Sequence, residues 1–358
     1  MRRALTIAAT PGVPLGPNPR VGCVLLDATG SVLGEGHHRG AGTDHAEVDA
    51  LHDAARRGHD VRGATAVVTL EPCDHTGRTG PCTQALLAAG VRRVVHARSD
   101  PNPEAAGGAG TLRAAGVEVE SGLLADEAGV LNRGWTHGLT HHRPLVTWKL
   151  ATTLDGRSAA ADGTSRWITG TAARADVHRL RARVDAVVAG TGTVLVDDPQ
   201  LTVRPAPGDG STPLPAQPLR VVVGERDLPA GARVLDDEAE TLHLRDRDPH
   251  VVLDVLFERG RRHVLLEGGP TLAAAWLRAG VVDEVVAYVA PVLLGAGTAA
   301  VADLGITTIT DAFRPRVAEV VVLPADPTAP GEQPDVRLTL VPTPSDPQHD
   351  QQHDQKES

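Results

Sequence analysis

Three short pieces of sequence decide the fold of the first part of this chain: H-A-E at 45–47, E-P-C at 71–73 and P-C at 81–82. An Ala-rich helical pattern at 46–57 and a strand-like apolar run at 64–70 separate the first two pieces. The third opens a helix expected over 82–89, because proline favours the first positions of a helix. Asp44 suits the N-cap of the helix expected to begin at His45. The chemical motifs therefore lie at the ends of helices and strands of an α/β fold.

These residue types predict a zinc site that performs deamination. A catalytic zinc ion takes three nitrogen or sulfur ligands and leaves one position for water, and His45, Cys73 and Cys82 supply that number. Cys73 is expected to follow directly on a strand and Cys82 to lie in the first turn of a helix, and helix amino ends favour the thiolate that zinc requires. In zinc deaminases a glutamate that does not touch the metal carries the proton from the water to the ring nitrogen and the leaving amine. Glu47 is the candidate for this role.

Other uses of cysteine and histidine compete with this interpretation. Eight residues separate Cys73 from Cys82, and that spacing alone also allows a structural zinc site or simple burial. A structural site predicts that zinc removal unfolds the first domain, whereas a catalytic site can be emptied with a modest loss of stability. Cys23 lies on an alternating strand pattern and is interpreted as a small buried hydrophobe. Most of the sixteen histidines, including His52, His59 and those at 136–144, are interpreted as surface residues.

The 358 residues are enough for about two domains. Helix, strand, strand, helix, strand, helix and strand patterns follow one another up to about residue 134, with a hairpin over 20–36. The polar, proline-terminated segment 136–144 is predicted to connect this unit to a second α/β unit. The predicted limits are 1–138 for the first domain, 144–341 for the second and 342–358 for a disordered tail. A Pro- and Gly-dense stretch at 204–218 is predicted to be a surface loop.

Composition excludes several classes of function. The net charge is −10 with a pI near 5.9, which is the wrong sign for a protein that neutralises nucleic-acid phosphates. No stretch has the length of a membrane span or the form of a cleavable signal. Three cysteines, an odd number, argue against a disulfide framework. We therefore expect a cytoplasmic protein with a small-molecule substrate, no nucleic-acid partner and no membrane partner.

Motifs in both halves resemble the bifunctional deaminase and reductase family of riboflavin biosynthesis. In the first half these are P-N-P-R-V-G-C at 17–23, G-E-G-H-H at 34–38, H-A-E-V at 45–48 and T-L-E-P-C-D-H-T-G-R-T-G-P-C at 69–82. In the second half they are K-L-A-T-T-L-D-G-R at 149–157, S-R-W-I-T-G at 165–170, V-L-V-D-D-P-Q-L-T-V-R at 194–204 and E-G-G-P-T-L-A-A-A-W-L-R-A-G at 267–280. The resemblance covers roughly residues 1–341, and the eight-residue cysteine gap is the normal form in that family.

The resemblance implies a fold and a two-step reaction. The first domain would be a cytidine-deaminase-like three-layer α/β/α domain, and the second would be a dihydrofolate-reductase-like α/β domain. With one zinc ion the first would remove the 2-amino group of a diaminopyrimidinone that carries a phosphoribosylamino arm, giving an aminouracil. With NADPH the second would reduce the ribosyl group to ribityl. The resemblance also implies a homo-oligomer formed through the reductase domain.

The resemblance also assigns residues to each substrate and cofactor. Family positions near the deaminase substrate are occupied by Asn18, His38 and His75. Positions that contact NADPH carry Ala151, Trp167, Thr193, Asp197, Gly268, Gly269 and Thr271. Positions that contact the reductase substrate carry Ser165, Arg181, Leu201, Arg204 and Glu267. A glycine turn between a strand and a helix lets backbone approach phosphate, although alone such a turn is more often a plain chain reversal.

Three questions stay open at this stage. Gly224 stands where the family commonly has an acidic residue, which leaves cofactor contacts from that loop in doubt. Lys149 and Asp155 are both conceivable proton donors in the reductase step. An alternative function is a nucleoside or nucleobase deaminase whose second domain only binds ligands. That alternative predicts activity on cytidine or guanine without NADPH turnover.

Overall fold

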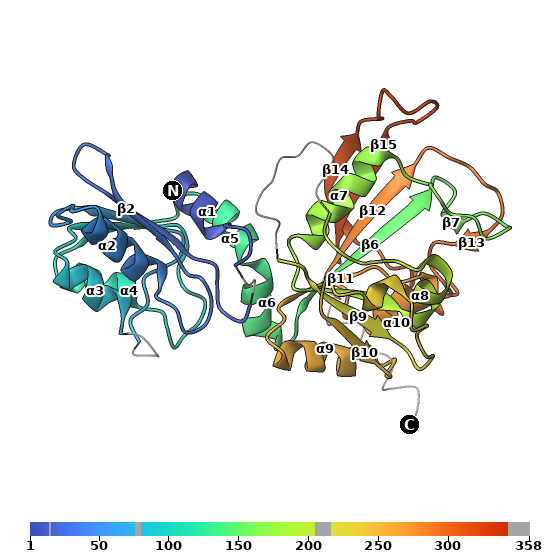
Figure 1. The fold of residues 1–358 in the computed structure, drawn as a ribbon, viewed down its shortest axis with the longest axis horizontal. Helices are drawn as coiled ribbons and strands as arrows, with labels where there is room; N and C mark the ends of the chain where they lie inside the picture. Colours follow the sequence, from blue (N-terminus) through green and yellow to red (C-terminus); the bar gives the residue numbers. More distant parts are fainter. Residues whose placement is uncertain (14–15, 76–79, 205–215, 343–358) are drawn as a thin grey trace.

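The computed structural model describes residues 1–13, 16–75, 80–204 and 216–342, and it contains two α/β domains side by side (Figure 1). The predicted tail, apart from residue 342, lies outside the described residues, as does 205–215 within the predicted surface loop. None of the described helices combines the length and apolar character needed to cross a membrane. The two domains are described in turn.

The first domain is built on a five-stranded sheet in the order β2-β1-β3-β4-β5. Its strands are β1 (Gly22–Leu26), β2 (Val32–His37), β3 (Thr65–Val68), β4 (Arg93–His96) and β5 (Glu118–Ser121). The predicted hairpin is confirmed, because β1 pairs antiparallel with β2. β1 also pairs antiparallel with β3, whereas β3, β4 and β5 run parallel. The carboxyl ends of the parallel strands consequently meet at one edge.

Helices cover both faces of this sheet and make three layers. One face carries α2 (Ala46–Arg56), α3 (Cys82–Ala88) and α4 (Gly108–Ala114), and the other carries α1 (Arg2–Ala8) and α5 (Ala125–Leu131). Small residues let α2 lie directly on β2. A Cβ on Gly34 would lie 2.4 Å from the Ala50 carbonyl oxygen, and one on Gly36 would lie 2.2 Å from the Ala50 nitrogen. The close packing of α2 against β2 therefore explains why both glycines of the G-E-G motif are needed.

The segment 136–144, predicted to be a polar connection, is mostly helical. Helix α6 spans Arg133–His141, and only residues 142–144 separate it from the second domain's first strand. Gly134 and Gly138 let this helix approach Arg262, because a Cβ on either glycine would come within 2.9 Å of that residue. The segment does lie between the two domains, but its helical form was not predicted, because the packing of α6 depends on Arg262, more than a hundred residues away.

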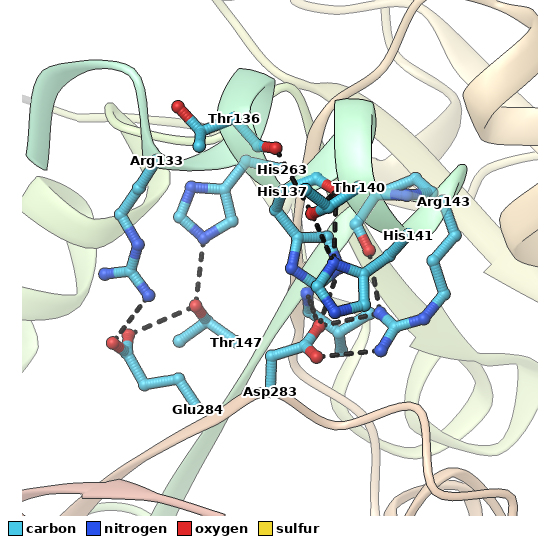
Figure 2. Close-up of polar contacts among 12 residues, drawn as sticks. Arg133, Thr136, His137, Thr140, His141, Arg143, Thr147, His263, Asp283 and Glu284 are labelled. Carbon is cyan, nitrogen blue, oxygen red and sulfur yellow. Dashed lines mark hydrogen bonds and ion pairs between the residues drawn. The ribbon is translucent and has the colours of Figure 1, made fainter. Parts of the chain in front are cut away.

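Polar side chains attach α6 to the second domain (Figure 2). Arg143 donates to both carboxylate oxygens of Asp283 at 2.7 and 2.8 Å, and Arg133 donates to Glu284 at 2.6 Å. His137, predicted to be a surface residue, has a side chain only 10% exposed and lies 3.6 Å from the Asp283 carboxylate. Burial lowers the pKa of His137 to about 4. The connection is therefore an ordered part of the domain junction.

The second domain contains an eight-stranded sheet in the order β10-β9-β8-β11-β6-β12-β15-β14. Its strands are β6 (Leu145–Thr153), β8 (Ala186–Gly190), β9 (Leu219–Val223), β10 (Thr241–Leu244), β11 (His263–Leu266), β12 (Glu284–Ala290), β14 (Arg316–Leu323) and β15 (Asp335–Val341). The six adjacent strands from β10 to β12 in this order run parallel to one another. β15 pairs antiparallel with β12, and β14 pairs antiparallel with β15. Strands β7 (Arg157–Ala159) and β13 (Thr298–Ala299) form a separate pair.

Helices also cover both faces of the second sheet. On one face, α9 (Pro249–Glu258) and α10 (Pro270–Arg278) pack against the sheet and form a hydrophobic core with it. Trp276 of α10 is buried in this core. Helices α7 (Thr171–Arg181) and α8 (Thr191–Asp197) pack on the other face. With few aromatic residues, both cores consist mainly of Val, Leu and Ala. The crossover helices leave the carboxyl ends of the parallel strands open, where ligands usually bind in such sheets.

Candidate active sites

The three predicted zinc ligands meet at one edge of the first sheet. His45 is the N-cap of α2, Cys73 follows β3, and Cys82 is the first residue of α3. The expected N-cap, Asp44, lies one residue too early, and the extended conformation begins the helix after His45 instead. The Asp44 carboxylate accepts a hydrogen bond from His52 at 3.1 Å, so it is engaged away from the helix end.

The ligand atoms have the spacing that zinc requires. His45 Nδ1 lies 3.4 Å from Cys73 Sγ and 3.3 Å from Cys82 Sγ, and all three ligand atoms lie within 4.8 Å of one another. Ligands at zinc–nitrogen and zinc–sulfur bond lengths sit about 3.5 Å apart on a tetrahedron. One imidazole and two thiol groups thus occupy three corners, and the fourth corner is free for water.

The charges of the cysteines fit a divalent cation. Hydrogen bonds from Cys82 and His45 lower the pKa of the Cys73 thiol to about 4. The same contact with Cys73, together with burial, raises the pKa of Cys82. At this short distance the negative charge of the Cys73 thiolate opposes ionisation of the Cys82 thiol. A zinc ion removes this conflict, because its two positive charges stabilise both thiolates at once.

Glu47 lies next to the ligands without belonging to them. It is the second residue of α2 and its side chain is buried, with 3% of the residue exposed. Burial raises the pKa of its carboxyl group to about 7. A carboxyl group with a pKa near neutrality can both accept and release a proton. The position and protonation of Glu47 suit the proton transfer predicted for it.

Two of the three predicted substrate-binding residues surround His45. Asn18 Nδ2 lies 3.0 Å from His38 Nε2, and the His38 ring contacts the His45 ring edge-on at 5.5 Å between centroids. His38 Nδ1 lies 3.1 Å from the main-chain oxygen of Asp44, which orients the imidazole. The Nδ1 atom of His75 is buried and has no hydrogen-bond partner among the described residues. It is available to a ligand.

Two carboxylates around Cys73 were not predicted to contribute to this site. Glu71 accepts hydrogen bonds from the main-chain nitrogens of Asp100 and Ala109 at 3.1 and 2.9 Å. Asp74 accepts hydrogen bonds at 2.6 Å from Thr83 and from Thr111. Both carboxylates hold the loop that carries Cys73 against neighbouring helices. The only sequence feature that pointed to these two carboxylates was their position on either side of Pro72-Cys73. That position did not reveal which residues they would hydrogen-bond.

A second candidate site is a cavity of about 840 Å³ at the carboxyl ends of β6, β8, β9 and β11. Eight residues that the resemblance assigned to cofactor or substrate line it: Ala151, Ser165, Thr193, Asp197, Glu267, Gly268, Gly269 and Thr271. The glycine turn leads into α10, whose N-cap is Gly269 and whose first residue is Pro270. The amino end of α10 faces the cavity, as expected for a phosphate site.

Charged groups are buried at the β6 and β11 side of this cavity. Arg181 donates to both oxygens of Glu267 at 2.5 and 3.0 Å, and both side chains are nearly covered. Lys149 also lines the cavity, and burial lowers the pKa of its ammonium group. Asp155, by contrast, is not among the lining residues. Its carboxylate accepts hydrogen bonds from Thr153 and from main-chain nitrogens, and these lower its pKa to about 2.

Four predicted contact residues lie outside the cavity lining: Arg181, which is joined to it through Glu267, and three others. Trp167 is 70% exposed, with the Arg174 guanidinium 4.8 Å from its ring centroid. Leu201 is buried. The main-chain nitrogen of Arg204 lies 3.2 Å from His178 Nδ1. Lys149, a conceivable proton donor, and Gly224 also line the cavity, together with Arg226 and Arg247, which the sequence did not assign to any ligand.

Models of known protein families match both domains. The model described as the cytidine and deoxycytidylate deaminase zinc-binding region matches residues 1–98. The model described as the RibD C-terminal domain matches residues 144–325. The predicted pair of fold classes is therefore confirmed, as are the zinc and NADPH cofactors. The second match does not support the alternative in which the second domain is non-catalytic.

Individual proteins resemble the chain over most of its length. The riboflavin biosynthesis protein RibD of Mycobacterium tuberculosis H37Rv is 55% identical over 300 residues, which cover 83% of this chain and 86% of that protein. RibD of Escherichia coli K12 is 40% identical and covers 89% of this chain and 95% of the relative. A crystal structure from Thermotoga maritima superposes with a TM-score of 0.82 at 31% identity, over 96% of this chain and 97% of the other. That structure is described as a diaminohydroxyphosphoribosylaminopyrimidine deaminase/5-amino-6-(5-phosphoribosylamino)uracil reductase.

Proposed function

Because this chain belongs to the RibD family of riboflavin biosynthesis proteins, we propose that its two sites act in sequence on one phosphoribosyl pyrimidine. The first domain deaminates 2,5-diamino-6-(5-phosphoribosylamino)pyrimidin-4(3H)-one to 5-amino-6-(5-phosphoribosylamino)uracil. The second reduces the ribosyl group of that product to ribityl. The observation that carries this proposal is the convergence of His45, Cys73 and Cys82 beside the buried Glu47 in a chain that also contains a reductase domain.

In the deaminase step the residues of this chain position the ring and move protons. Bound zinc supplies a Lewis acid that makes water a nucleophile at neutral pH. Glu47 would take up the two protons of that water one after the other, passing the first to the ring nitrogen and the second to the leaving amine. Asn18, His38 and His75 contact the pyrimidine or its phosphoribosyl arm. The short contacts among Asn18, His38 and the Asp44 carbonyl support this role, because they orient the imidazole before substrate binds.

In the reductase step the cavity of the second domain holds cofactor and substrate together. NADPH supplies a hydride to the ribosyl carbon. The amino end of α10 and the turn at Gly268 and Gly269 bind cofactor phosphate. Arg181 and Glu267 hold the substrate, with Ser165, Leu201 and Arg204 as further contacts. Ala151, Trp167, Thr193, Asp197 and Thr271 complete the proposed NADPH contacts.

We assign the proton donor of the reductase step to Lys149 and not to Asp155. Lys149 is half-buried in the cavity lining near Glu267, and desolvation lowers the pKa of its ammonium group, which makes proton release easier. Asp155 has a lowered pKa and is ionised at neutral pH, so it has no proton to give. Lys149→Met is expected to lower the reductase rate by about 100-fold or more, and unchanged reduction would contradict the assignment.

An assay that follows the two half-reactions separately tests the proposed function. Purified protein is supplied with the diaminopyrimidinone, and ammonia release and NADPH oxidation are recorded in parallel. Ammonia should appear with or without NADPH, whereas NADPH should be consumed only after deamination. Release of ammonia from cytidine or guanine, with no consumption of NADPH, would contradict the proposal.

The quaternary structure and location also belong to this proposal. We place the domain limits at 1–138 and 144–341, with α6 as the shared element. We place a homo-oligomeric contact on β14, the edge strand of the second sheet, where Val317, Val320 and Val322 are 53%, 59% and 66% exposed. An exposed apolar edge strand favours association with a second copy. NADPH and a phosphorylated substrate are cytoplasmic metabolites, so cell fractionation should find the protein in the cytoplasm.

A further inference from the structure

One end of the reductase cavity is cationic, and no sequence motif predicted it. Three basic residues line this cavity within the described part of the chain, namely Lys149, Arg226 and Arg247. Lys149 lies on β6 beside Glu267, at the proposed site of chemistry. Arg226 follows β9, and Arg247 follows β10 at the edge of the sheet. The two arginines therefore belong to a different end of the cavity from the reacting groups.

The order of strands separates this cationic end from the glycine turn. Gly268 and Gly269 follow β11, which is two strands away from β9 in the order β10-β9-β8-β11. Neighbouring strands are about 4.8 Å apart, so the two positions are separated by about 10 Å. A cofactor whose pyrophosphate binds at the glycine turn must extend toward β9 and β10 to reach the arginines. The group that arrives there is the adenosine part.

The Arg226 guanidinium is free to bind an anion. Its Nη2 atom lies 3.0 Å from the position that a Cβ on Gly192 would occupy, so it covers the chain just after β8. No hydrogen bond or ion pair joins it to another residue in the described part of the chain. Arg247 has only an exposed contact with Glu225, at 3.6 Å, with both side chains 69% exposed. Exposed pairs of this kind contribute little, and a phosphate can replace them.

Gly224 explains how Arg226 reaches this position. Its φ of +128° favours glycine, and a Cβ there would lie 2.7 Å from Thr191 Oγ1. The chain can therefore turn past Thr191 immediately after β9 and direct residue 226 back over the cavity. Glycine adds no charge of its own at this turn, where an acidic side chain would repel an anionic ligand. This chain combines a neutral turn with an arginine two residues later.

We propose that Arg226, assisted by Arg247, binds the 2′-phosphate of NADPH and so selects NADPH over NADH in this chain. The inference rests on the proposed reductase function and deepens it. The 2′-phosphate distinguishes the two cofactors and is attached to the adenosine ribose. An arginine near that ribose is a general means of accepting the extra phosphate, and guanidinium groups bind phosphate in a planar, bidentate geometry.

Calorimetric titration of the full chain with NADP⁺ and NAD⁺, and with 2′,5′-ADP and 5′-AMP, tests this proposal. Arg226→Gln should weaken NADP⁺ and 2′,5′-ADP about 10- to 100-fold, the range of a lost charge-assisted contact, and leave NAD⁺ and 5′-AMP unchanged. Arg247→Gln should act in the same direction by a smaller factor. Arg245→Gln is the matched control, because Arg245 pairs with Asp227 and does not line the cavity.

Three outcomes would overturn the proposal. Equal weakening of NADP⁺ and NAD⁺ by Arg226→Gln would assign the arginine to the pyrophosphate. No weakening by either cavity variant would remove both arginines from the cofactor site. Failure of the wild-type chain to bind either nucleotide would reject the reductase function itself. Ammonia release by the deaminase domain serves as the folding check for each variant, since Arg226 and Arg247 are exposed and far from Glu47 in the chain.

Discussion

The buried carboxyl group of Glu47 is the proposed proton carrier of the first domain. Glu47→Gln keeps the shape and volume of the side chain but cannot accept a proton. We expect ammonia release to fall by about 10²- to 10⁴-fold, the usual contribution of a general acid–base. Bound zinc, measured by atomic absorption, should remain near one per chain, because Glu47 is not a ligand. NADPH oxidation with the deaminated substrate should be unchanged. Retained deamination would remove Glu47 from the mechanism.

His263 makes the stability of the second domain depend on pH. Its ring is buried, and its Nε2 atom lies 2.9 Å from Thr147 Oγ1 (Figure 2). Burial, aided by the nearby Arg133, lowers the pKa of His263 to about 3. An unfolded histidine has a pKa of about 6.5, so below that pH the unfolded chain gains a proton that the folded chain excludes. Stability should therefore fall with pH from about 6.5 toward 3.

Urea unfolding at pH 7 and pH 5 measures this effect. Buried Trp148 and Trp276 lie in the second domain and report on its unfolding by fluorescence. His263 should account for about 2 kcal/mol of the stability lost between the two pH values. His263→Gln should reduce the difference by that amount, whatever its effect at pH 7. His250→Gln, at an exposed position at the start of α9, is the control. An unchanged difference in the His263 variant would contradict the argument.

At the scale of elements, the junction between α6 and β6 depends strongly on Asp283, which also lies 3.6 Å from His137 on α6. Its carboxylate accepts two hydrogen bonds from Arg143 and one from the main-chain nitrogen of Val146, at 2.7 to 2.8 Å. Asp283→Ala leaves the guanidinium and a main-chain donor without their partner. Because both side chains are about one fifth exposed, we expect a loss of about 2 kcal/mol, below the cost of breaking a fully buried pair.

Denaturant unfolding again provides the measurement, together with limited proteolysis of the junction. Asp283→Ala should lower the unfolding free energy and accelerate cleavage within residues 133–144. The matched control is Asp60→Ala, which removes a pair with Arg62 in which the side chains are 68% and 81% exposed. That exposed pair should contribute little to stability, because solvent screens it. Equal effects of the two variants would show that α6 is not held by Asp283.

At the scale of the whole molecule, the exposed strand β14 predicts association between copies. Val320→Lys introduces a charge into the proposed contact, and it should convert the oligomer to monomer at micromolar concentration. Light scattering coupled to size-exclusion chromatography gives the mass of each species. Leu123→Lys, at a 51% exposed position in the first domain, is the control and should leave the mass unchanged. A monomeric wild-type chain would reject the proposed contact.

The agreement between sequence and structure is best where the information is local. Strand and helix patterns, the hairpin over 20–36 and the helix opening at Cys82 are confirmed within one to three residues at most ends. Their apolar periodicity depends on neighbours along the chain. The zinc ligands could also be recognised, because few reactions require one histidine and two cysteines around a glutamate. The N-cap at Asp44 was wrong by one residue, since capping depends on backbone torsions that residue type only favours.

By itself the sequence determined the two domains, the zinc-dependent deaminase chemistry and the resemblance that adds the reductase. Only the tertiary structure decided that 133–141 is a docked helix, that Lys149 is half-buried near Glu267, and that Arg226 lines the cavity of the second domain. The physical reason is the same in each case. Burial and charge depend on partners that are distant in sequence, as Asp283 is from Arg143, and only the packing of both sheets brings such partners together.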